Sequence, residues 1–243
     1  MTNTPADTIE LLQQRLTDTK EQLSQAAQKA GRSSADIQLL AVSKTQAAEA
    51  LRMAFSLGQR AFGENYLQEA RDKQQVLNDL DIEWHFIGPI QSNKTREIAE
   101  HFHWVHSVDR LKIAQRLSKQ RPETLAPLNI CLQINVDNEK SKFGILLNEI
   151  DNLVNGIASL PNLKLRGLMA IPAPKESYED QLITFKILTD TMAKYPKMDT
   201  LSMGMSSDMS AAIEAGSTMV RVGTGIFGKR QAQGKQLEKK QVQ

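Results

Sequence analysis

A short unit of hydrophobic and polar positions repeats along the chain. A run of apolar residues ends in a polar residue or a glycine, and a segment with the helical spacing of apolar residues follows it. Alternation of this kind is typical of a parallel β-sheet whose strands are connected by helices packed outside it. The apolar runs occupy residues 37–43, 61–63, 83–87, 104–107, 128–134, 163–169, 200–203 and 219–222.

The number of units favours closure of the sheet into a barrel. A (β/α)₈ barrel typically needs about 250 residues, and the chain has 243. An open, doubly wound sheet is the alternative, which periodicity alone does not exclude. No GxGxxG sequence follows the first run, and this weakens the alternative. We therefore expect an α/β fold, a single (β/α)₈ TIM barrel that occupies residues 1–230.

An extra helix is expected before the first strand. Thr4 and Pro5 suit a capping residue and the first helical position, and Gly31 is a suitable stop. Residues 231–243 are polar and have no apolar face, so we expect a disordered tail there. The later helices are expected at residues 47–57 and 66–77, from near 94, from 109, and at 148–159, 178–195 and 209–215.

Composition excludes several classes of protein. The 30 basic and 28 acidic residues give a formal net charge of +2, too balanced to predict nucleic-acid binding through bulk electrostatics. Cys131 is the one cysteine, so no intrachain disulfide is expected. No signal peptide is visible, and no apolar run approaches the roughly 18 residues of a membrane span. We expect a soluble, cytoplasmic protein without a membrane segment.

Residues that directly follow the strands are the candidates for a site, because barrels build their active face there. Lys44 follows the first run, and Glu64 and Asn65 follow the second. An amine held against apolar walls has a lowered pKa, and its neutral form attacks aldehydes. The alternative is a solvated lysine at the start of a helix.

The loops after the seventh and eighth runs are candidates for phosphate binding. They combine glycines, which allow close backbone approach, with the hydroxyls of Ser206, Ser207 and Thr224. Capping of the next helix by Ser206 and Ser207 explains the serines equally well.

Arg221 lies within the eighth run, between apolar residues, and needs a buried partner there. One possibility is a salt bridge inside the barrel. The other is contact with a ring nitrogen of a ligand, which the permanently charged guanidinium would keep unprotonated. Such a ring is a poorer electron sink, which disfavours carbanion chemistry of the transaminase type.

Several of these segments resemble the pyridoxal phosphate homeostasis proteins. The similarity runs from about Gly31 to Gly228. The segments that carry it are LLAVSKT (39–45), FGENY (62–66), WHFIGPIQSNK (84–94), RGLMAIP (166–172), LSMGMS (201–206) and MVRVGTGIFG (219–228).

The resemblance implies a barrel like the N-terminal domain of the bacterial alanine racemases, with pyridoxal 5′-phosphate (PLP) as the cofactor. Lys44 would form an aldimine with PLP, Arg221 would face the pyridine nitrogen, and Asn65 would lie beside the ring. The phosphate would be held by Ser206, Gly223 and Thr224.

The function implied by the resemblance is intracellular PLP homeostasis without robust catalysis. Two-base racemisation needs a second acid–base group from an added domain, for which this chain leaves no room. A weak PLP-dependent amino-acid racemase is the alternative, and aldolase-type chemistry on Lys44 without a cofactor is a third. We expect a monomer, because no large exposed apolar stripe is evident, with PLP-dependent apo-enzymes as the recipients of the cofactor.

Lys142 is a further amine near the expected mouth of the barrel, next to Phe143, where the family pattern favours a smaller or more polar residue. It acts either as a second PLP-reactive amine or, as we favour, as a positive charge that attracts phosphate. No metal site is expected, because His101, His103 and His106 diverge along a helix and a strand.

Overall fold

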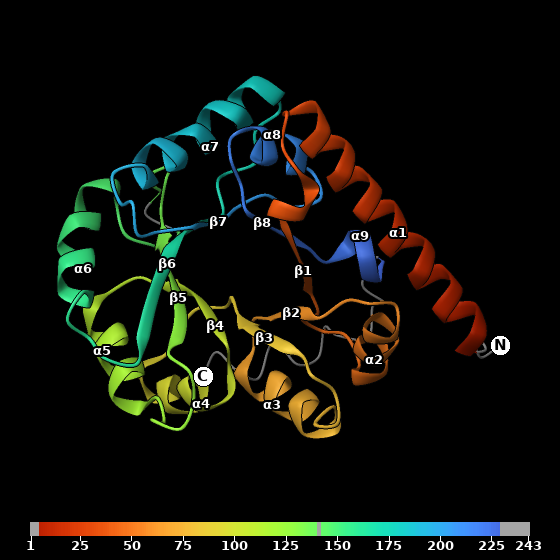
Figure 1. Ribbon diagram of the computed structural model, residues 1–243, viewed down its shortest axis with the longest axis horizontal. Coiled ribbons are helices and arrows are strands. Elements are labelled where there is room, and N and C mark those ends of the chain that lie inside the picture. Colours follow the sequence, from red (N-terminus) through yellow and green to blue (C-terminus); the bar gives the residue numbers. More distant parts are fainter. Residues whose placement is uncertain (1–4, 140–141, 229–243) are drawn as a thin grey trace.

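The computed structural model describes residues 5–139 and 142–228. In this part of the chain, eight parallel strands form a closed barrel in the order of the sequence (Figure 1). Closure is made by β8 pairing with β1, with Leu39 opposite Val220. The strands are β1 (Gln38–Val42), β2 (Ala61–Glu64), β3 (Glu83–Phe86), β4 (Trp104–Val108), β5 (Leu128–Ile134), β6 (Leu163–Ala170), β7 (Thr200–Ser202) and β8 (Met219–Val222). The (β/α)₈ prediction is confirmed, and the open-sheet alternative is wrong.

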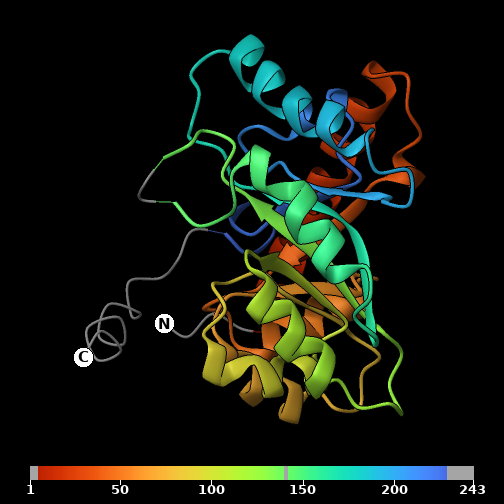
Figure 2. The ribbon, with the colours of Figure 1, turned by 90° about the vertical axis from the view of Figure 1, so that its left-hand side faces the viewer.

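Helices surround the strands in both views (Figures 1 and 2). The described helices are α1 (Pro5–Lys29), α2 (Ala48–Ser56), α3 (Leu67–Val76), α4 (Thr95–His101), α5 (Leu111–Gln120), α6 (Ile150–Ile157), α7 (Tyr178–Met192), α8 (Met209–Glu214) and α9 (Thr224–Phe227). Each strand boundary lies within one residue of its prediction. Three short 3₁₀ segments, at Ser34–Asp36, Ser92–Lys94 and Leu147–Glu149, were not predicted.

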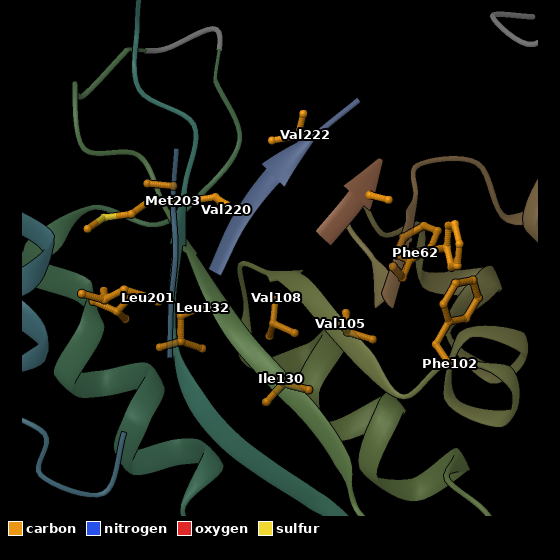
Figure 3. Packing of buried hydrophobic residues seen from close by; sticks show 14 of the residues in the cluster. Phe62, Phe102, Val105, Val108, Ile130, Leu132, Leu201, Met203, Val220 and Val222 are labelled. Carbon is orange, nitrogen blue, oxygen red and sulfur yellow. The ribbon is translucent and has the colours of Figure 1, made fainter. Parts of the chain in front are cut away.

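Alternation along the strands divides the core into two layers. Residues that point outward pack beneath the helices, among them Phe62, Val105, Ile130 and Leu201 (Figure 3). Residues that point inward fill the centre of the barrel: Leu40, Ala61, Trp104, Cys131, Met169 and Met219. Because both faces of each strand are buried, the sequence shows continuous apolar runs rather than alternation.

The predicted N-terminal helix is α1, which packs against α2, α8 and α9 along one side of the barrel (Figure 1). It buries Leu12, Leu16 and Leu23. Gly31 ends the helix segment with φ of +67°, a conformation that glycine adopts without steric cost. Thr4 and residues 231–243 lie outside the described residues, so the cap, the tail and the 1–230 boundary remain predictions.

Within the part of the chain that the structure describes, no helix is both long enough and apolar enough to cross a membrane.

Candidate functional site at the mouth of the barrel

Four neighbouring strands bring the predicted site residues to the same end of the barrel. Around the barrel the order is β7, β8, β1, β2, and the loops that follow these strands carry Ser206, then Gly223 and Thr224, then Lys44, then Asn65. Val42 pairs with Gly63, two residues before Lys44 and Asn65 respectively. A Cβ on Gly223 would lie 3.2 Å from the carbonyl oxygen of Val42. The end of β8 is therefore packed directly against the strand that leads to Lys44.

Lys44 is half-buried and occupies a turn after β1. Its neighbour Thr45 has φ of +64°, which a β-branched residue rarely adopts. The turn is held at both ends: the Ser43 carbonyl accepts from Lys73 Nζ at 2.7 Å, and the Thr45 N–H donates to Glu69 at 2.5 Å. These contacts fix the backbone on either side of Lys44.

Lys73 and Glu69 belong to a cluster around the buried Glu64, here called the Glu64 cluster, that also includes Ser43 and the exposed Thr45. Glu64 Oε1 accepts from Ser43 Oγ at 2.6 Å and from Lys73 Nζ at 2.7 Å, and Lys73 also pairs with Glu69 at 2.5 Å. Burial raises the pKa of Glu64 to about 7, although the charge and hydrogen bonds of Lys73 and the hydrogen bond from Ser43 oppose the shift. The cluster supports the Lys44 turn from beneath.

The prediction that Glu64 lies in the mouth is wrong. Ala61 and Gly63 face the inside of the barrel, so alternation along β2 directs Glu64 outward, beneath α3. Its partner Lys73 is one of the two buried residues of α3. The sequence analysis did not identify Lys73. Its position three residues after Ala70 places it on the same face of the helix, and this spacing was the signal that could have indicated its burial.

Asn65 is partly buried, and its Oδ1 atom has no hydrogen-bond partner among the described residues. Buried polar atoms rarely remain unsatisfied, so this atom marks a place where a ligand donor fits. The loop after β3 packs tightly against it, because a Cβ on Gly88 would lie 2.0 Å from the Asn65 carbonyl oxygen. Only glycine allows this approach.

The loops after β7 and β8 lie against each other. A Cβ on Gly225 would lie 3.2 Å from Ser206 Oγ, and Gly204 has φ of +94°. Ser206 and Thr224 are exposed, with Gly223 partly buried between β8 and α9. The residue that caps α8 is Asp208, without a side-chain cap bond, so the capping role considered for Ser206 and Ser207 is not observed. Two hydroxyls beside closely packed glycines suit phosphate oxygens.

Arg221 is 4% exposed and has neutral partners. Its Nη1 donates to Ser202 at 2.5 Å to the carbonyl and 2.8 Å to Oγ, and its Nη2 donates to the Ala170 carbonyl at 2.8 Å. No salt bridge to Arg221 occurs among the described residues, so the intra-barrel salt bridge is excluded there. Burial lowers the pKa of Arg221 to about 10, with Asp208 and Cys131 opposing the shift. The group is still a cation at pH 7.

Lys142 lies in the loop after β5 and forms ion pairs with Asp137 and Glu139, both at 3.3 Å. Asp137 also pairs with Lys175 at 3.2 Å and accepts from the Ala173 N–H, which ties this loop to the one after β6. Two carboxylates therefore balance much of the Lys142 charge. Phe143 beside it is 62% exposed.

The histidines do not gather into a metal site. His101 ends α4, and His103 accepts the Trp84 N–H at 2.9 Å. His85 and His106 lie inside the barrel and bond to each other at 2.9 Å. No group of three or more potential ligands that could hold a metal occurs in residues 5–139 and 142–228.

Comparisons with known proteins show the family of this chain. Residues 15–231 match the family model described as alanine racemase, N-terminal domain. A pyridoxal phosphate homeostasis protein of Escherichia coli is 54% identical over 222 residues, covering 88% of this chain and 95% of that protein. One from Pseudomonas aeruginosa is 58% identical over 209 residues, covering 86% and 91%.

Solved structures of related proteins have the same fold as this chain. PipY of Synechococcus elongatus, in a structure with PLP bound, superposes with a TM-score of 0.77 at 35% identity, covering 89% of this chain and all (100%) of that one. An alanine racemase of Clostridium difficile, at 15% identity and a TM-score of 0.69, shares the fold over 92% of this chain and 58% of its own. The chain belongs to the pyridoxal phosphate homeostasis protein family, whose barrel is that of the alanine racemase N-terminal domain.

Proposed function

We propose that this chain binds pyridoxal 5′-phosphate on Lys44 and serves the intracellular homeostasis of this cofactor without robust catalysis. The observation that carries the proposal is the convergence of Ser206, Arg221, Gly223, Thr224, Lys44 and Asn65 on four adjacent strands. Relatives that are 54% and 58% identical bear the name of PLP homeostasis proteins, and PipY, at 35% identity, has been solved with PLP.

The residues present fit the cofactor. An aldehyde, a ring and a phosphate need an amine, a flat wall with a polar partner, and hydrogen-bond donors. Lys44 supplies the amine, Asn65 supplies an unsatisfied buried oxygen, and Ser206 and Thr224 supply exposed hydroxyls. When PLP is bound, condensation of its aldehyde with an amine releases water and leaves an imine, which masks the reactive aldehyde.

The site residues favour holding the cofactor over turning substrate over. Arg221 is a buried cation that keeps a proton off a facing pyridine nitrogen, so the ring gains little capacity to stabilise a carbanion. Of the six proposed site residues, only Lys44 carries a side chain of a type that commonly serves in general acid–base catalysis. We also propose that the chain acts as a cytoplasmic monomer that supplies PLP-dependent apo-enzymes; its one cysteine is buried, as suits a reducing compartment.

The test is the visible absorbance of purified protein incubated with PLP, before and after borohydride reduction. Wild type should show a band of covalently bound cofactor, and reduction should fix the cofactor mass on the peptide that contains Lys44. Lys44→Ala should lack both. Lys142→Ala is the matched control, because Lys142 is an ion-paired lysine at the same end of the barrel; it should keep the band.

Three results would overturn parts of the proposal. Absence of the band in wild type after added PLP would remove the binding claim and leave a cofactor-free barrel. Loss of the band in Lys142→Ala together with its retention in Lys44→Ala would place the covalent attachment of PLP on Lys142 instead of Lys44. Steady turnover of an amino acid by the loaded protein would replace the carrier with a racemase or lyase.

A further inference from the structure

A chain of side chains crosses the inside of the barrel and ends on Arg221. It begins at Glu83, whose Oε2 is 3.3 Å from His85 Nε2. His85 Nδ1 is 2.9 Å from His106 Nε2, His106 Nδ1 is 2.8 Å from Ser202 Oγ, and Ser202 Oγ accepts from Arg221. These residues come from β3, β4, β7 and β8, so the chain connects opposite sides of the barrel.

The direction of the hydrogen bonds follows from the two charged ends. Arg221 only donates, so Ser202 Oγ accepts from it, and we assign the hydroxyl proton of Ser202 to His106 Nδ1, 2.8 Å away. His106 then carries its proton on Nε2 and donates to His85 Nδ1, which leaves the Nε2–H of His85 facing Glu83. That last contact is poorly aligned, since His85 Nε2 has no hydrogen-bond partner by strict geometry. The three hydrogen bonds therefore run from the guanidinium to His85, and His85 Nε2 lies 3.3 Å from the Glu83 carboxylate.

The charges of the surrounding groups support these protonation states. Burial lowers the pKa of His85, opposed by Glu83, and His103 lowers it further. Burial lowers the pKa of His106 well below its ordinary value, and both His85 and Arg221 add to the shift. Both rings are therefore neutral at physiological pH.

Glu83, by contrast, is ionised. Burial alone raises its pKa, but the nearby His85 and the hydrogen bonds from Trp104 and Gln38 bring the pKa below its ordinary value. The Trp104 Nε1–H donates at 2.8 Å and the Gln38 amide at 2.7 Å. The His85 ring also stacks on Trp104 with centroids 5.5 Å apart, which fixes its plane.

A barrel core whose only role is packing does not require this series of polar side chains from Glu83 to Arg221. Several neighbouring inward positions of the barrel are filled by apolar residues, such as Leu40, Met169 and Met219. Buried polar networks cost stability, and the hydrogen bonds that they do make favour one arrangement of the side chains. The arrangement specified here is the orientation of the Arg221 guanidinium.

We propose that His106 is a positioning residue that, through Ser202, holds Arg221 in the one orientation in which it donates to the ring nitrogen of the cofactor. The inference rests on the proposed function, because that function gives Arg221 its ring contact. The ring nitrogens of His106 bond to His85 and Ser202, so its hydrogen bonds reach Arg221 through Ser202.

The variants His106→Leu and His106→Gln separate hydrogen bonding from volume. The glutamine amide can accept from Ser202 and donate to His85, as the imidazole does, whereas leucine does neither. Met169→Leu is the control, an inward residue outside the chain. The readouts are the pH midpoint of the visible band of the PLP-loaded protein and the Kd for PLP, with circular dichroism to confirm folding.

His106→Leu should shift the midpoint by more than about half a pH unit and weaken PLP binding about tenfold, the size of effect expected for losing one well-placed hydrogen bond. His106→Gln should restore both to within about twofold of wild type, and Met169→Leu should leave both unchanged. Equal impairment of the leucine and glutamine variants, or a leucine variant that matches wild type, would overturn the inference.

A second measurement uses the cofactor-free protein. Side-chain ¹⁵N NMR should show His106 and His85 as neutral, Nε2-protonated rings from pH 6 to 8, and Ser202→Ala should shift the His106 Nδ1 signal. A positively charged His106, or a neutral His106 with its proton on Nδ1, would overturn the assigned direction of the hydrogen bonds between Arg221 and His85. Failure of wild type to bind PLP defeats the proposed function whatever the NMR shows, whereas PLP binding with an unmoved midpoint in His106→Leu defeats the positioning role alone.

Discussion

Lys73→Met tests the Glu64 cluster, because it removes the cation from a pair that is almost fully buried. The side chain of Lys73 is 6% exposed and that of Glu64 is 0% exposed. Methionine keeps most of the volume and removes the charge. Both the charge and the hydrogen bond of Lys73 lower the Glu64 pKa, so their loss should raise it above the wild-type value of about 7.

The sign of the pH dependence follows from that shift. A carboxylic acid whose pKa is higher in the folded protein than in the unfolded chain contributes stability at low pH, and this stability is lost as pH rises through the folded value. In wild type the loss falls between the unfolded pKa, near 4.5, and about 7. In Lys73→Met the loss of stability continues above pH 7, because Glu64 must either stay protonated or be buried as a carboxylate without the Lys73 cation.

The magnitude is about 1.4 kcal/mol for each pH unit between 7 and the raised pKa, since one pKa unit corresponds to that free energy. The cost of the substitution should therefore grow with pH, toward the roughly 3–5 kcal/mol typical of breaking a buried ion pair. Urea unfolding followed by circular dichroism at pH 7, 8 and 9 gives the free energy of unfolding directly.

The double variant Lys73→Met, Glu64→Gln is the control. Glutamine keeps an acceptor for Ser43 but does not titrate, so the added dependence on pH above 7 should disappear. A Lys73→Met cost that is the same at pH 7 and pH 9 would refute the reasoning, as would a double variant with the same slope as the single one.

Two further predictions concern the barrel itself. Gly204→Ala should destabilise the fold by more than about 2 kcal/mol in urea unfolding, because φ is +94° and the new Cβ would lie 2.6 Å from that of Ala212. Gly31→Ala is the control: φ is +67° but the space around it is open, so the substitution should cost only about 1–2 kcal/mol. Equal costs for the two substitutions would contradict the argument. Cys131 is fully buried, and burial raises the pKa of its thiol to about 12, so a thiol reagent at pH 8 should label it only as fast as the protein unfolds; rapid labelling of the folded protein would show an open path to the barrel interior.

The strands could be predicted closely because both of their faces are buried. A run such as residues 128–134 is apolar except for Asn129 and Gln133, and Pro127 directly before it marks where it begins. The 3₁₀ segments, for example Ser34–Asp36, are too short to show any periodicity, so the sequence carries no signal for them.

The site was predictable to the extent that it depends on position along the chain. Lys44, Asn65 and the glycine loops all follow strand ends, and a closed barrel collects strand ends at one rim. The Glu64 cluster was not predictable in the same way. Whether Glu64 faces the mouth or α3 depends on strand register, and a shift of one residue reverses the answer.

The partners of Arg221 illustrate a limit of another kind. His106 and Ser202 are 96 positions apart and meet because β4 and β7 face each other across the barrel. The sequence shows a buried arginine that needs a partner, and a carboxylate is the usual one. The structure provides neutral acceptors instead, with Glu83 placed at the far end of the chain. Separation of the two charges leaves the positive field of Arg221 at the mouth, where an anionic ligand and a ring nitrogen can use it.

The unsatisfied atoms of the structure support the same conclusion. Three buried side-chain atoms in the described residues lack a hydrogen-bond partner: Asn65 Oδ1, Glu64 Oε2 and His85 Nε2. One lies at the proposed site, one in the cluster that supports Lys44, and one in the chain that orients Arg221. Proteins tolerate such local costs mainly where function requires them. Two of the three, Asn65 Oδ1 and Glu64 Oε2, lie on either side of the end of β2, and the left-handed backbone of Thr45 lies between Lys44 and α2; together they argue that this end of the barrel is organised for a ligand rather than for stability.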